Sequence, residues 1–544
     1  MQPDETAPIH PDDPQAGAPV QPDETAPVRP DDPVAVAPVG PDRVPAGIRL
    51  IARVLRSAGH EAHLVGGCVR DLLRGVTPLD WDVATDARPD RLLALFPGAR
   101  YENRFGTVAV PLADGTHEVT TFRRDGTYSD HRRPDDVTFG DTLDEDLARR
   151  DFTVNALAIP LDADGAPGPV IDRTDGRTDL AAGVLRAVGD PATRFREDAL
   201  RMLRAVRFAA TLGFTLEPAT RDAIAAQASL AAHVSGERTF AELVRLLGAD
   251  RPSIGLRLAD ETGLLAVVAP ELARQWGIPQ AKVPGEDLWD HTCRTVDAAS
   301  ATSIDGLPQA RIAALLHDIG KPATYADGHF VGHDVVGAEL ATTWLEGLRA
   351  PRALTTRVAH LVRHHMFQYS PEWTDAAVRR FIRRVGVADL DALLDLRAAD
   401  NVGSGLAAAV DGLEDLRARC RDQVAAHAAF ARSDLALDGD DLMRGLGMAP
   451  GPAVGRLLDE LLEHVLVDPM LNERTRLLAA AREIAAGGAP AGAGSGAPPE
   501  SLGIPAGAGS GAPPESLGTP AGAGSGATTE SLGAGPGPAG DGRP

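Results

Sequence analysis

Two aspartates that stand two residues apart, Asp80 and Asp82, are the first residues of this chain whose spacing indicates chemistry. The alternating pattern of LDWDVAT predicts a strand over 79–85, and side chains two apart on a strand point to the same face. Paired carboxylates on one face can hold two hard divalent cations about 4 Å apart, and oxygen ligands of this kind suit Mg²⁺. Glu118, in the alternating segment HEVTTFR, is the third candidate catalytic carboxylate.

A pair of glycines stands shortly before these carboxylates. The segment HLVGG (63–67) predicts a short buried strand that enters a turn at Gly66 and Gly67, and VRDLLRG (69–75) predicts a short helix. The free N–H groups and the positive dipole at a helix start can receive a phosphate, and Arg70 adds a charged fork. A triphosphate with Mg²⁺ would use these groups together with the carboxylates. Ordinary turn chemistry and a solvated strand face are the structural alternative, and the closeness of the two motifs argues against it.

A second set of chemically capable residues, histidines and aspartates, lies in the C-terminal half. The segments that carry them are WDHTCRTVD, LLHDIGKPAT and LRAAD, and the candidate ligands are His291, His317, Asp318 and Asp400. Neutral imidazole and carboxylate are the ligands that a divalent transition metal prefers in a mixed nitrogen and oxygen site. Three further histidines are candidates for a second metal or for substrate phosphate: His333, His364 and His365. For any single histidine, a hydrogen-bonded or exposed side chain is the simpler interpretation.

The elements that must position these residues divide into a small sheet and a long helical region. Up to residue 123, strands and helices alternate, which indicates a small mixed β-sheet with helices on one face. The polar segment 123–136 has no apolar period and is expected to be a mobile loop. From about residue 140 the pattern is helical, and one long amphipathic helix is predicted over 194–213. The predicted fold class is therefore α+β.

Both ends of the chain are repetitive and carry no apolar face. Residues 2–20 return at 21–39 with a 19-residue period, and the segment 490–503 recurs with a 15-residue period. Stacked repeats need an apolar face to bury, so this composition excludes a solenoid. It predicts disordered tails over 1–45 and 487–544.

The formal net charge of the 544-residue chain is −23, which excludes a broadly basic nucleic-acid-binding protein. The ends carry part of this acidity, because residues 1–45 hold nine acidic and two basic side chains. Lysine occurs only at Lys282 and Lys321. Clusters of arginine are therefore where phosphates and base edges would be bound.

The three cysteines stand far apart in the sequence, and no apolar run approaches the ~18 residues of a membrane-spanning helix. These features exclude a disulfide framework, a zinc ribbon and a membrane span. The N-terminus is rich in proline and aspartate, which is unlike a signal peptide. We expect a soluble cytoplasmic protein.

Four motifs in order give the chain a resemblance to a known family. In chain order they are LVGGCVRD with DWD, RRDFTVNALAI (149–159), REDALRMLRAVRF (196–208) and GERTFAELVRLL (236–247). With this series the chain resembles the class II CCA-adding tRNA nucleotidyltransferases and bacterial poly(A) polymerases of the DNA-polymerase-β-like superfamily. The resemblance is close over about 46–250 and loose beyond. It implies a nucleotidyltransferase head on the mixed sheet, followed by an extended all-α neck and body.

The resemblance implies a role for each matched residue. The catalytic set with Mg²⁺ is Asp80, Asp82 and Glu118, and the nucleotide-binding set is Gly66, Gly67, Arg70, Arg150, Asp151, Asp198, Arg201, Arg204 and Arg207. Asp198 and Arg201 would read the Watson–Crick edge of CTP or ATP, because a carboxylate accepts from an exocyclic amine and a guanidinium donates to ring acceptors. Arg204 and Arg207 would extend a basic stripe for phosphates. A charged helix face with Glu–Arg pairs is the structural alternative.

The series H…HD…D resembles the HD phosphohydrolase superfamily. This resemblance implies that His291, His317, Asp318 and Asp400 bind a divalent transition metal, and that Lys321 helps to bind phosphate. A phosphatase or phosphodiesterase would suit repair of RNA ends, by analogy alone. The expected organisation is a disordered tail (1–45), a nucleotidyltransferase head (46–185), a neck for base and RNA binding (186–280), an HD domain (281–405), a helical tail domain (406–486) and a second disordered tail (487–544).

The implied reaction transfers nucleotides from CTP and ATP to the 3′ end of tRNA, adding C, C and A without a template and releasing pyrophosphate. Three alternatives stay open: a poly(A) polymerase on the same scaffold, an HD phosphohydrolase with a degenerate transferase head, and a non-catalytic RNA-binding protein. The intact HD set favours CCA addition, as does the lack of a strongly basic C-terminal extension. The motifs alone do not separate CCA addition from poly(A) synthesis.

Overall fold

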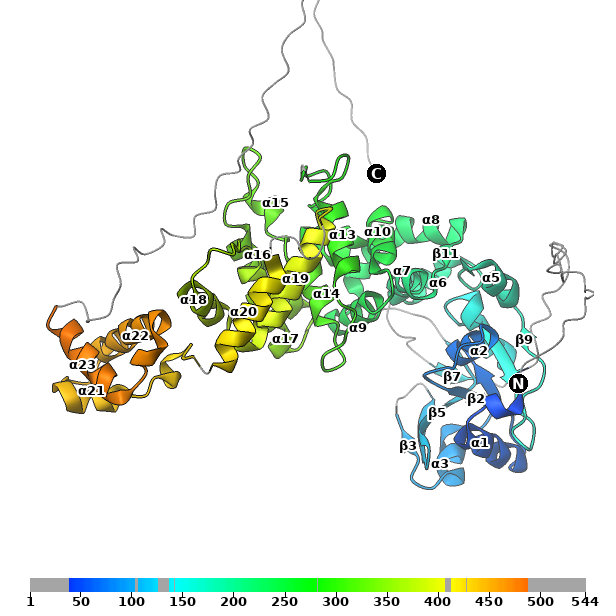
Figure 1. Ribbon diagram of the computed structural model, residues 1–544. Helices are drawn as coiled ribbons and strands as arrows, with labels where there is room; N and C mark the ends of the chain where they lie inside the picture. The colour runs from blue at the N-terminus through cyan, green and yellow to red at the C-terminus, as the bar shows by residue number, and fades with distance from the viewer. Residues whose placement is uncertain are drawn as a thin grey trace, which may run out of the picture. The chain divides into compact units, whose positions relative to one another are not determined.

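The computed structural model describes residues 39–102, 106–125, 137–140, 142–280, 282–406, 412–426 and 428–487 (Figure 1). Its N-terminal part contains a mixed sheet of seven strands in the order β3-β4-β5-β2-β1-β8-β9. Within this sheet β2 is parallel to β5, and the other strand pairs are antiparallel. The strands are β1 (His63–Val65), β2 (Asp82–Thr85), β3 (Arg100–Tyr101), β4 (Thr107–Leu112), β5 (Gly115–Thr121), β8 (Leu157–Pro160) and β9 (Ile171–Asp172). The predicted α+β class is confirmed.

Helices pack against both faces of this sheet. Because successive strand residues point to opposite faces, Leu64 joins one hydrophobic cluster while Val65 joins another. The helices of the first and larger cluster are α1 (Ala46–Ser57), α2 (Gly67–Leu73) and α3 (Pro89–Leu95). On the opposite face lies α4 (Leu143–Ala148). The prediction of helices on one face is therefore wrong for α4, whose six residues are too few to show a helical period.

The helical region begins with a break that the sequence pattern did not predict. Instead of one helix over 194–213, two helices meet at Asp198, which has an extended backbone with φ −142° and ψ 104°. Asp198 Oδ1 accepts a hydrogen bond from the Leu200 N–H at 3.1 Å, so local capping wins over helix continuation. The helices of this region are α5 (Gly176–Ala182), α6 (Pro191–Glu197), α7 (Leu200–Leu212), α8 (Pro218–Gln227), α9 (Gly236–Leu247), α10 (Pro252–Glu261), α11 (Leu264–Val268) and α12 (Pro270–Ala273).

The remaining helices are arranged in pairs that bring distant histidines together. α13 packs on α19, α14 packs on α17, and α16 packs on α17. These helices and those after them are α13 (Leu288–Ala298), α14 (Gln309–Leu316), α15 (Lys321–Thr324), α16 (His333–Gly347), α17 (Arg352–His364), α18 (Asp375–Val385), α19 (Leu390–Gly403), α20 (Leu413–Ala425), α21 (Gly439–Leu446), α22 (Pro452–Val467) and α23 (Arg474–Ala485). One continuous hydrophobic core runs from Phe152 to Cys420 and includes α7, α13, α14, α17 and α19.

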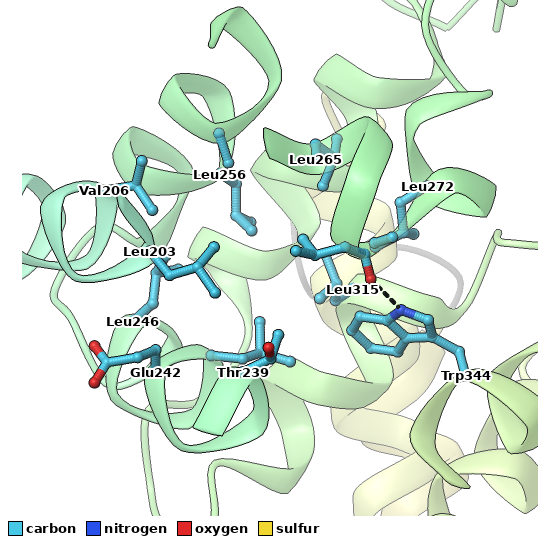
Figure 2. A pocket seen from close by; sticks show the side chains of 14 residues that line it. Leu203, Val206, Thr239, Glu242, Leu246, Leu256, Leu265, Leu272, Leu315 and Trp344 are labelled. Atoms are coloured by element: carbon cyan, nitrogen blue, oxygen red, sulfur yellow. Dashed lines mark hydrogen bonds between the residues drawn. The ribbon is translucent and has the colours of Figure 1, made fainter. Parts of the chain in front are cut away.

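This core contains a small apolar cavity of about 60 Å³ between α7, α9, α10, α14 and α16 (Figure 2). Leucines make up half of its lining residues, and Trp344 closes one side with its Nε1–H donating to the Val268 carbonyl at 2.9 Å. Nucleotide pockets are several times larger, at roughly 300 Å³ or more. The cavity is therefore a gap in packing and does not qualify as a nucleotide site.

The ends of the chain and the polar loop are described only in part. Of the predicted tails, residues 1–38 and 488–544 lie outside the described residues, whereas Val39 and Val44 are buried in the core of the head. Of the polar segment, only Arg123–Asp125 is described, as β6, which pairs with β7 (Val137–Phe139). A second two-stranded sheet pairs β10 (Val184–Leu185) with β11 (Thr215–Leu216). Within the described residues, every helix is too short or too polar to cross a membrane.

Candidate functional site

The three predicted carboxylates of the head lie close to one another near the start of β2. Asp82 is the first residue of β2 and lies in register with Glu118 on the parallel strand β5. Asp80 lies in the bend before β2, so the prediction that one strand carries both aspartates is wrong. The reason is that pairing between β2 and β5 starts only at Asp82.

These carboxylates repel one another. Burial raises the pKa of Asp82, and the charge of Asp80 adds to this effect while Arg150 opposes it. Burial also raises the pKa of Glu118, together with the charges of Asp82, Glu102 and Asp80. A group of acids whose pKa values rise for this reason gains stability from a cation placed among them.

Arg150 is the cation that the protein itself brings to this group. A Cβ atom at Gly66, whose φ is +78°, would lie 2.7 Å from Arg150 Nη1 and 3.6 Å from Asp82 Oδ2. Only glycine therefore allows the guanidinium to lie over the turn. Arg150 Nη2 is held 3.1 Å from Asp146 Oδ2, a buried carboxylate of α4. α2 begins at Gly67, two residues before the start of the helix predicted over 69–75.

A chain of polar contacts connects the head to α7. Arg70 is buried, and its Nη1 donates to Asn155 Oδ1 at 2.7 Å. Asn155 Nδ2 donates in turn to Asp151 Oδ1 at 3.1 Å, and Arg204 Nε donates to Asp151 Oδ2 at 2.7 Å. Burial alone would raise the pKa of Asp151, but Arg204 and Asn155 outweigh it and lower the pKa to about 2. Asp151 is thus a fixed anion between the head and α7.

The residues expected to read the base lie at the break between α6 and α7. Asp198 Oδ2 is 2.7 Å from Arg238 Nη2 of α9. Arg201 is buried and donates to the Arg149 carbonyl at 2.9 Å and to Glu197 Oε2 at 2.5 Å. Both side chains are therefore held in place by protein partners.

The two arginines that follow on α7 differ in their surroundings. The side chain of Arg204 is 30% exposed, whereas Arg207 is buried with its Nε 2.5 Å from Glu242 Oε2. Glu242 lies on α9 and also lines the apolar cavity (Figure 2). The side chains of Arg204 and Arg207 therefore do not form a stripe that faces phosphates.

The histidines and aspartates of the C-terminal half meet in one buried cluster, here called the HD cluster. Its first donor set, with all ligand atoms within 4.8 Å of one another, is His291, His317 and Asp400. The His317 Nδ1–H donates to the Ala314 carbonyl at 2.8 Å, which leaves Nε2 facing the cluster. His291 Nε2 lies 3.1 Å from His317 Nε2 and 3.3 Å from Asp400 Oδ1.

The second donor set of the HD cluster is Asp318, His333 and His365. Both histidines donate Nδ1–H to a backbone carbonyl three residues earlier, at 2.7 Å, and their Nε2 atoms lie 3.5 Å from Asp318 Oδ1. The other carboxylate oxygen of Asp318 is 3.1 Å from His317 Nε2. Asp318 therefore lies between the two sets, which is the arrangement of a bridging ligand.

The charge states of the HD cluster suit metal binding. Burial lowers the pKa of His333 to about 4 and also lowers that of His317, so both imidazoles are neutral near pH 7. Burial would raise the pKa of Asp318 and Asp400, but neighbouring histidines and lysines outweigh it and hold both well below the usual range. His317 and His333 therefore offer neutral nitrogen beside ionised oxygen, whereas at His291 burial is outweighed by the hydrogen bonds to Asp318 and Asp400, which raise the pKa.

A close backbone contact brings α16 to this cluster. A Cβ atom at Gly320 would lie 2.2 Å from the His333 carbonyl oxygen and 2.6 Å from the Gly337 nitrogen. His364, which the sequence grouped with His333 and His365, lies elsewhere, packed edge-on against His360 with ring centroids 4.6 Å apart. In a helix, consecutive residues point in different directions, so His364 and His365 separate.

Several residues of both sites escaped the sequence analysis. They are Asp146, Asn155, Arg238 and Glu242 in the first region, and Lys282 and Arg397 beside the HD cluster. Asn155, Arg238 and Glu242 stand inside the motifs 149–159 and 236–247, so their positions carried a signal. Arg397 stands in the segment LRAAD, three residues before Asp400, whereas Lys282 stands outside the quoted segments and reaches Asp400 through a long-range contact.

Comparison with known families agrees with this division of sites. A model described as the poly A polymerase head domain matches residues 62–186. A model described as the probable RNA and SrmB-binding site of polymerase A matches 213–275, and an HD domain model matches 288–404.

The chain is also similar to curated proteins and to a solved structure over most of its length. It is 36% identical to the CCA-adding enzyme of Lacticaseibacillus paracasei over 80% of this chain and 95% of the relative. The CCA-adding enzyme of Geobacillus kaustophilus is 34% identical over 79% and 94%. The crystal structure of the Bacillus stearothermophilus CCA-adding enzyme in complex with CTP is similar with a TM-score of 0.61 and 31% identity, over 81% and 97%. With its head carboxylates and its HD cluster, the chain belongs to the family of CCA-adding enzymes.

Proposed function

We propose that this chain is a template-independent CCA-adding tRNA nucleotidyltransferase, which uses CTP and ATP and releases pyrophosphate. The observation that carries the proposal is the register of Asp82 with Glu118, with Asp80 close enough to raise the pKa of both. Two relatives support it, because the chain covers 95% and 94% of their lengths and both are named CCA-adding enzymes.

Mg²⁺ is the ion that we assign to the head. The donor set consists of oxygen only, and the mutual repulsion of the three carboxylates fits a hard cation. When bound there, Mg²⁺ would lower the pKa of the RNA 3′-hydroxyl and neutralise the triphosphate. Arg150, held over the Gly66 turn by Asp146, presents its guanidinium to the phosphates beside Asp82.

Base selection is assigned to Asp198 and Arg201. The carboxylate of Asp198 would accept from the exocyclic amine that C and A share, while Arg201 would donate to a ring acceptor. Arg238 holds the first and the Arg149 carbonyl holds the second, so both groups are oriented before a nucleotide arrives. The same residues would serve a poly(A) polymerase, which stays the second candidate because the head matches a model of that description.

For the HD cluster we propose a divalent transition metal site and a metal-dependent phosphohydrolase that repairs RNA ends. Four histidine Nε2 atoms and two carboxylates converge there, and three of the histidines are oriented by backbone carbonyls. The metal would polarise a phosphoryl oxygen when bound. Asp318 would keep the two donor sets at a constant separation.

The organisation into two tails, a head (46–185), a neck (186–280), an HD domain (281–405) and a tail domain (406–486) is also proposed. The matched models support it, because 62–186, 213–275 and 288–404 fall inside these parts to within one residue. We place the protein in the cytoplasm. The three free, buried cysteines support this compartment, since thiols stay reduced there.

The test is nucleotide incorporation into a tRNA transcript that lacks its 3′ CCA, with each NTP and with CTP and ATP together. We expect two C residues and one A residue. Asp80→Ala combined with Asp82→Ala should abolish transfer and leave tRNA binding within about twofold, whereas Asp90→Asn, an exposed carboxylate of α3, should act as wild type. Runs of A without C would overturn CCA addition in favour of poly(A) synthesis.

A further inference from the structure

The two lysines of this chain lie at the same place in the fold. Against 54 lysines and arginines in total, lysine occurs only at Lys282 and Lys321. Lys321 Nζ is 2.7 Å from Asp318 Oδ2, and Lys282 Nζ is 3.7 Å from Asp400 Oδ1. A chain that uses arginine at every other cationic position thus keeps its compact ammonium groups for the HD cluster. An ammonium is a point charge with rotatable donors, which suits one oxygen in a narrow space.

Each lysine is held beside the cluster by a neutral partner. Lys282 Nζ donates to Ser404 Oγ at 2.9 Å, and Lys321 Nζ donates to Gln280 Oε1 at 3.4 Å. The other end of that amide, Gln280 Nε2, is buried and has no hydrogen-bond partner in the part of the chain that the structure describes. An acceptor next to Lys321 would satisfy it.

The balance of charge at the cluster calls for an anion. The charged groups that act most strongly on Lys282 are Asp400, Lys321, Asp318 and Arg397. Arg397 Nη1 is itself 2.9 Å from Asp400 Oδ2. Two carboxylates thus face three cationic side chains before a divalent ion enters, and each bound ion adds positive charge. Lys321 is buried and Lys282 is exposed, so this positive charge extends from the cluster to the surface, where an anion from solvent can pair with it.

We propose that Lys282 and Lys321 form an ammonium pair that binds the phosphate group of a nucleotide or RNA end at the HD cluster. This rests on the phosphohydrolase proposed above and adds Lys282 to it as a substrate-binding residue. The segment before α13 thereby supplies one half of the phosphate site, and the turn after Asp318 supplies the other.

An aromatic pair beside Lys321 points to a nucleotide as the carrier of that phosphate. The rings of Tyr325 and Phe330 stack with centroids 5.2 Å apart and an angle of 28°. Lys321 Nζ lies 5.2 Å from the centre of the Phe330 ring. Tyr325 is 42% exposed, so part of its ring is open to a base. Stacking on an aromatic ring is how proteins hold single-stranded bases without reading their sequence.

The first experiment measures the affinity of the full chain for inorganic phosphate by calorimetry, with transition metal bound and after chelation. Lys282→Ala should weaken binding ~10-fold in both states, since it removes a hydrogen bond between two charged groups. Lys282→Arg should restore only part of the affinity. The matched control is Arg352→Ala, an exposed cation at the start of α17, which should bind as wild type.

The outcomes separate this proposal from the functions on which it rests. Wild-type phosphate affinity in Lys282→Ala would overturn the ammonium pair. CCA addition and bound metal should be unchanged in that variant, because Lys282 is neither a metal ligand nor part of the head. A wild-type chain that holds no metal would overturn the phosphohydrolase alone, because the chelated arm still measures the lysine pair.

The second experiment asks whether the phosphate is free or carried by a nucleotide. A nucleoside 3′-monophosphate replaces inorganic phosphate as the probe. Tyr325→Ala should weaken nucleotide binding several-fold and leave inorganic phosphate binding unchanged. Equal affinity of wild type and Tyr325→Ala for the nucleotide would overturn the nucleotide assignment.

Discussion

The head and the HD cluster prepare for metal ions in opposite ways. In the head, Asp82 and Glu118 have raised pKa values, because burial and mutual repulsion act on them with little relief. In the HD cluster, Asp318 and Asp400 have pKa values well below the usual range, because histidines and lysines surround them. Ligand atoms within 4.8 Å of one another form two donor sets in the HD cluster, whereas the described carboxylates of the head form none.

From this difference we infer how long a metal ion stays bound at each of the two sites. A preformed, buried donor set pays little to reorganise and holds its ion in the absence of substrate. A group of repelling carboxylates is completed by the ion and by the phosphates that arrive with it. We therefore expect the HD metal to purify with the protein and the head metal to come with the nucleotide.

The largest expected effect comes from the head. Asp82→Asn removes one charge from the carboxylate group at the start of β2 and should reduce nucleotide transfer by roughly 10³-fold. The metal content of the HD cluster should not change, and Asp90→Asn is the matched control. Nucleotide transfer at the wild-type rate in Asp82→Asn would contradict the assignment of a metal ion to the head carboxylates.

The second-largest effect is expected at the HD cluster. Asp318→Asn removes the carboxylate of the second donor set, which also lies 3.1 Å from His317 of the first set, and metal affinity should fall ~100-fold or more. Elemental analysis of the purified chain measures this, with His364→Gln as a control histidine outside the cluster. Full CCA addition in Asp318→Asn would show that the two sites are independent, whereas its loss would contradict the contrast between them.

A smaller effect tests whether the pKa of a carboxylate depends on the region in which it lies or on the cation with which it pairs. Asp151 lies in the head but resembles the HD carboxylates, because Arg204 lowers its pKa from 3.8 to about 2. A lowered folded-state pKa contributes stability above the unfolded value, here about 2 kcal/mol, and this is lost as pH falls from about 4 towards 2. Asp151→Asn should therefore lower the urea midpoint at pH 7, and its difference from wild type should shrink below pH 4. A gap that stays constant down to pH 2.5 would contradict the ion pair with Arg204.

The smallest effect is expected for an exposed ion pair. Arg173 and Asp144 form an ion pair in the head with exposed fractions of 60% and 62%. Exposed pairs contribute little, so Arg173→Gln should change the free energy of unfolding by less than about 0.5 kcal/mol. A change as large as that of Asp151→Asn would show that burial is not what separates these pairs.

Local patterns in the sequence predicted much of this molecule. The alternating segments and the glycine pair placed Gly66, Asp82 and Glu118 correctly, because strand period and turn chemistry act over a few residues. The break at Asp198 escaped prediction, since the apolar period continues through it. A side-chain cap and the pairing with Arg238 of α9 decide the backbone there.

Long-range contacts explain what could not be predicted at the sites. Asp80 was placed on a strand whose pairing in fact starts two residues later. His364 and His365 look equivalent in sequence, and only the packing of α16 on α17 selects His365. Lys282 stands in a segment without a motif and reaches Asp400 from 118 positions earlier in the chain, a distance in sequence that no local pattern covers.

The contact between Gly320 and α16 has a consequence for the second donor set of the HD cluster. A single methyl group at position 320 would need space now taken by the His333 carbonyl and the Gly337 nitrogen. It would push the first turn of α16 outward and carry His333 away from Asp318. We expect alanine at 320 to weaken metal binding by the second donor set, Asp318, His333 and His365, while every ligand residue stays in the sequence. The geometry of the cluster therefore depends on the close backbone contact at Gly320 as well as on its ligand residues.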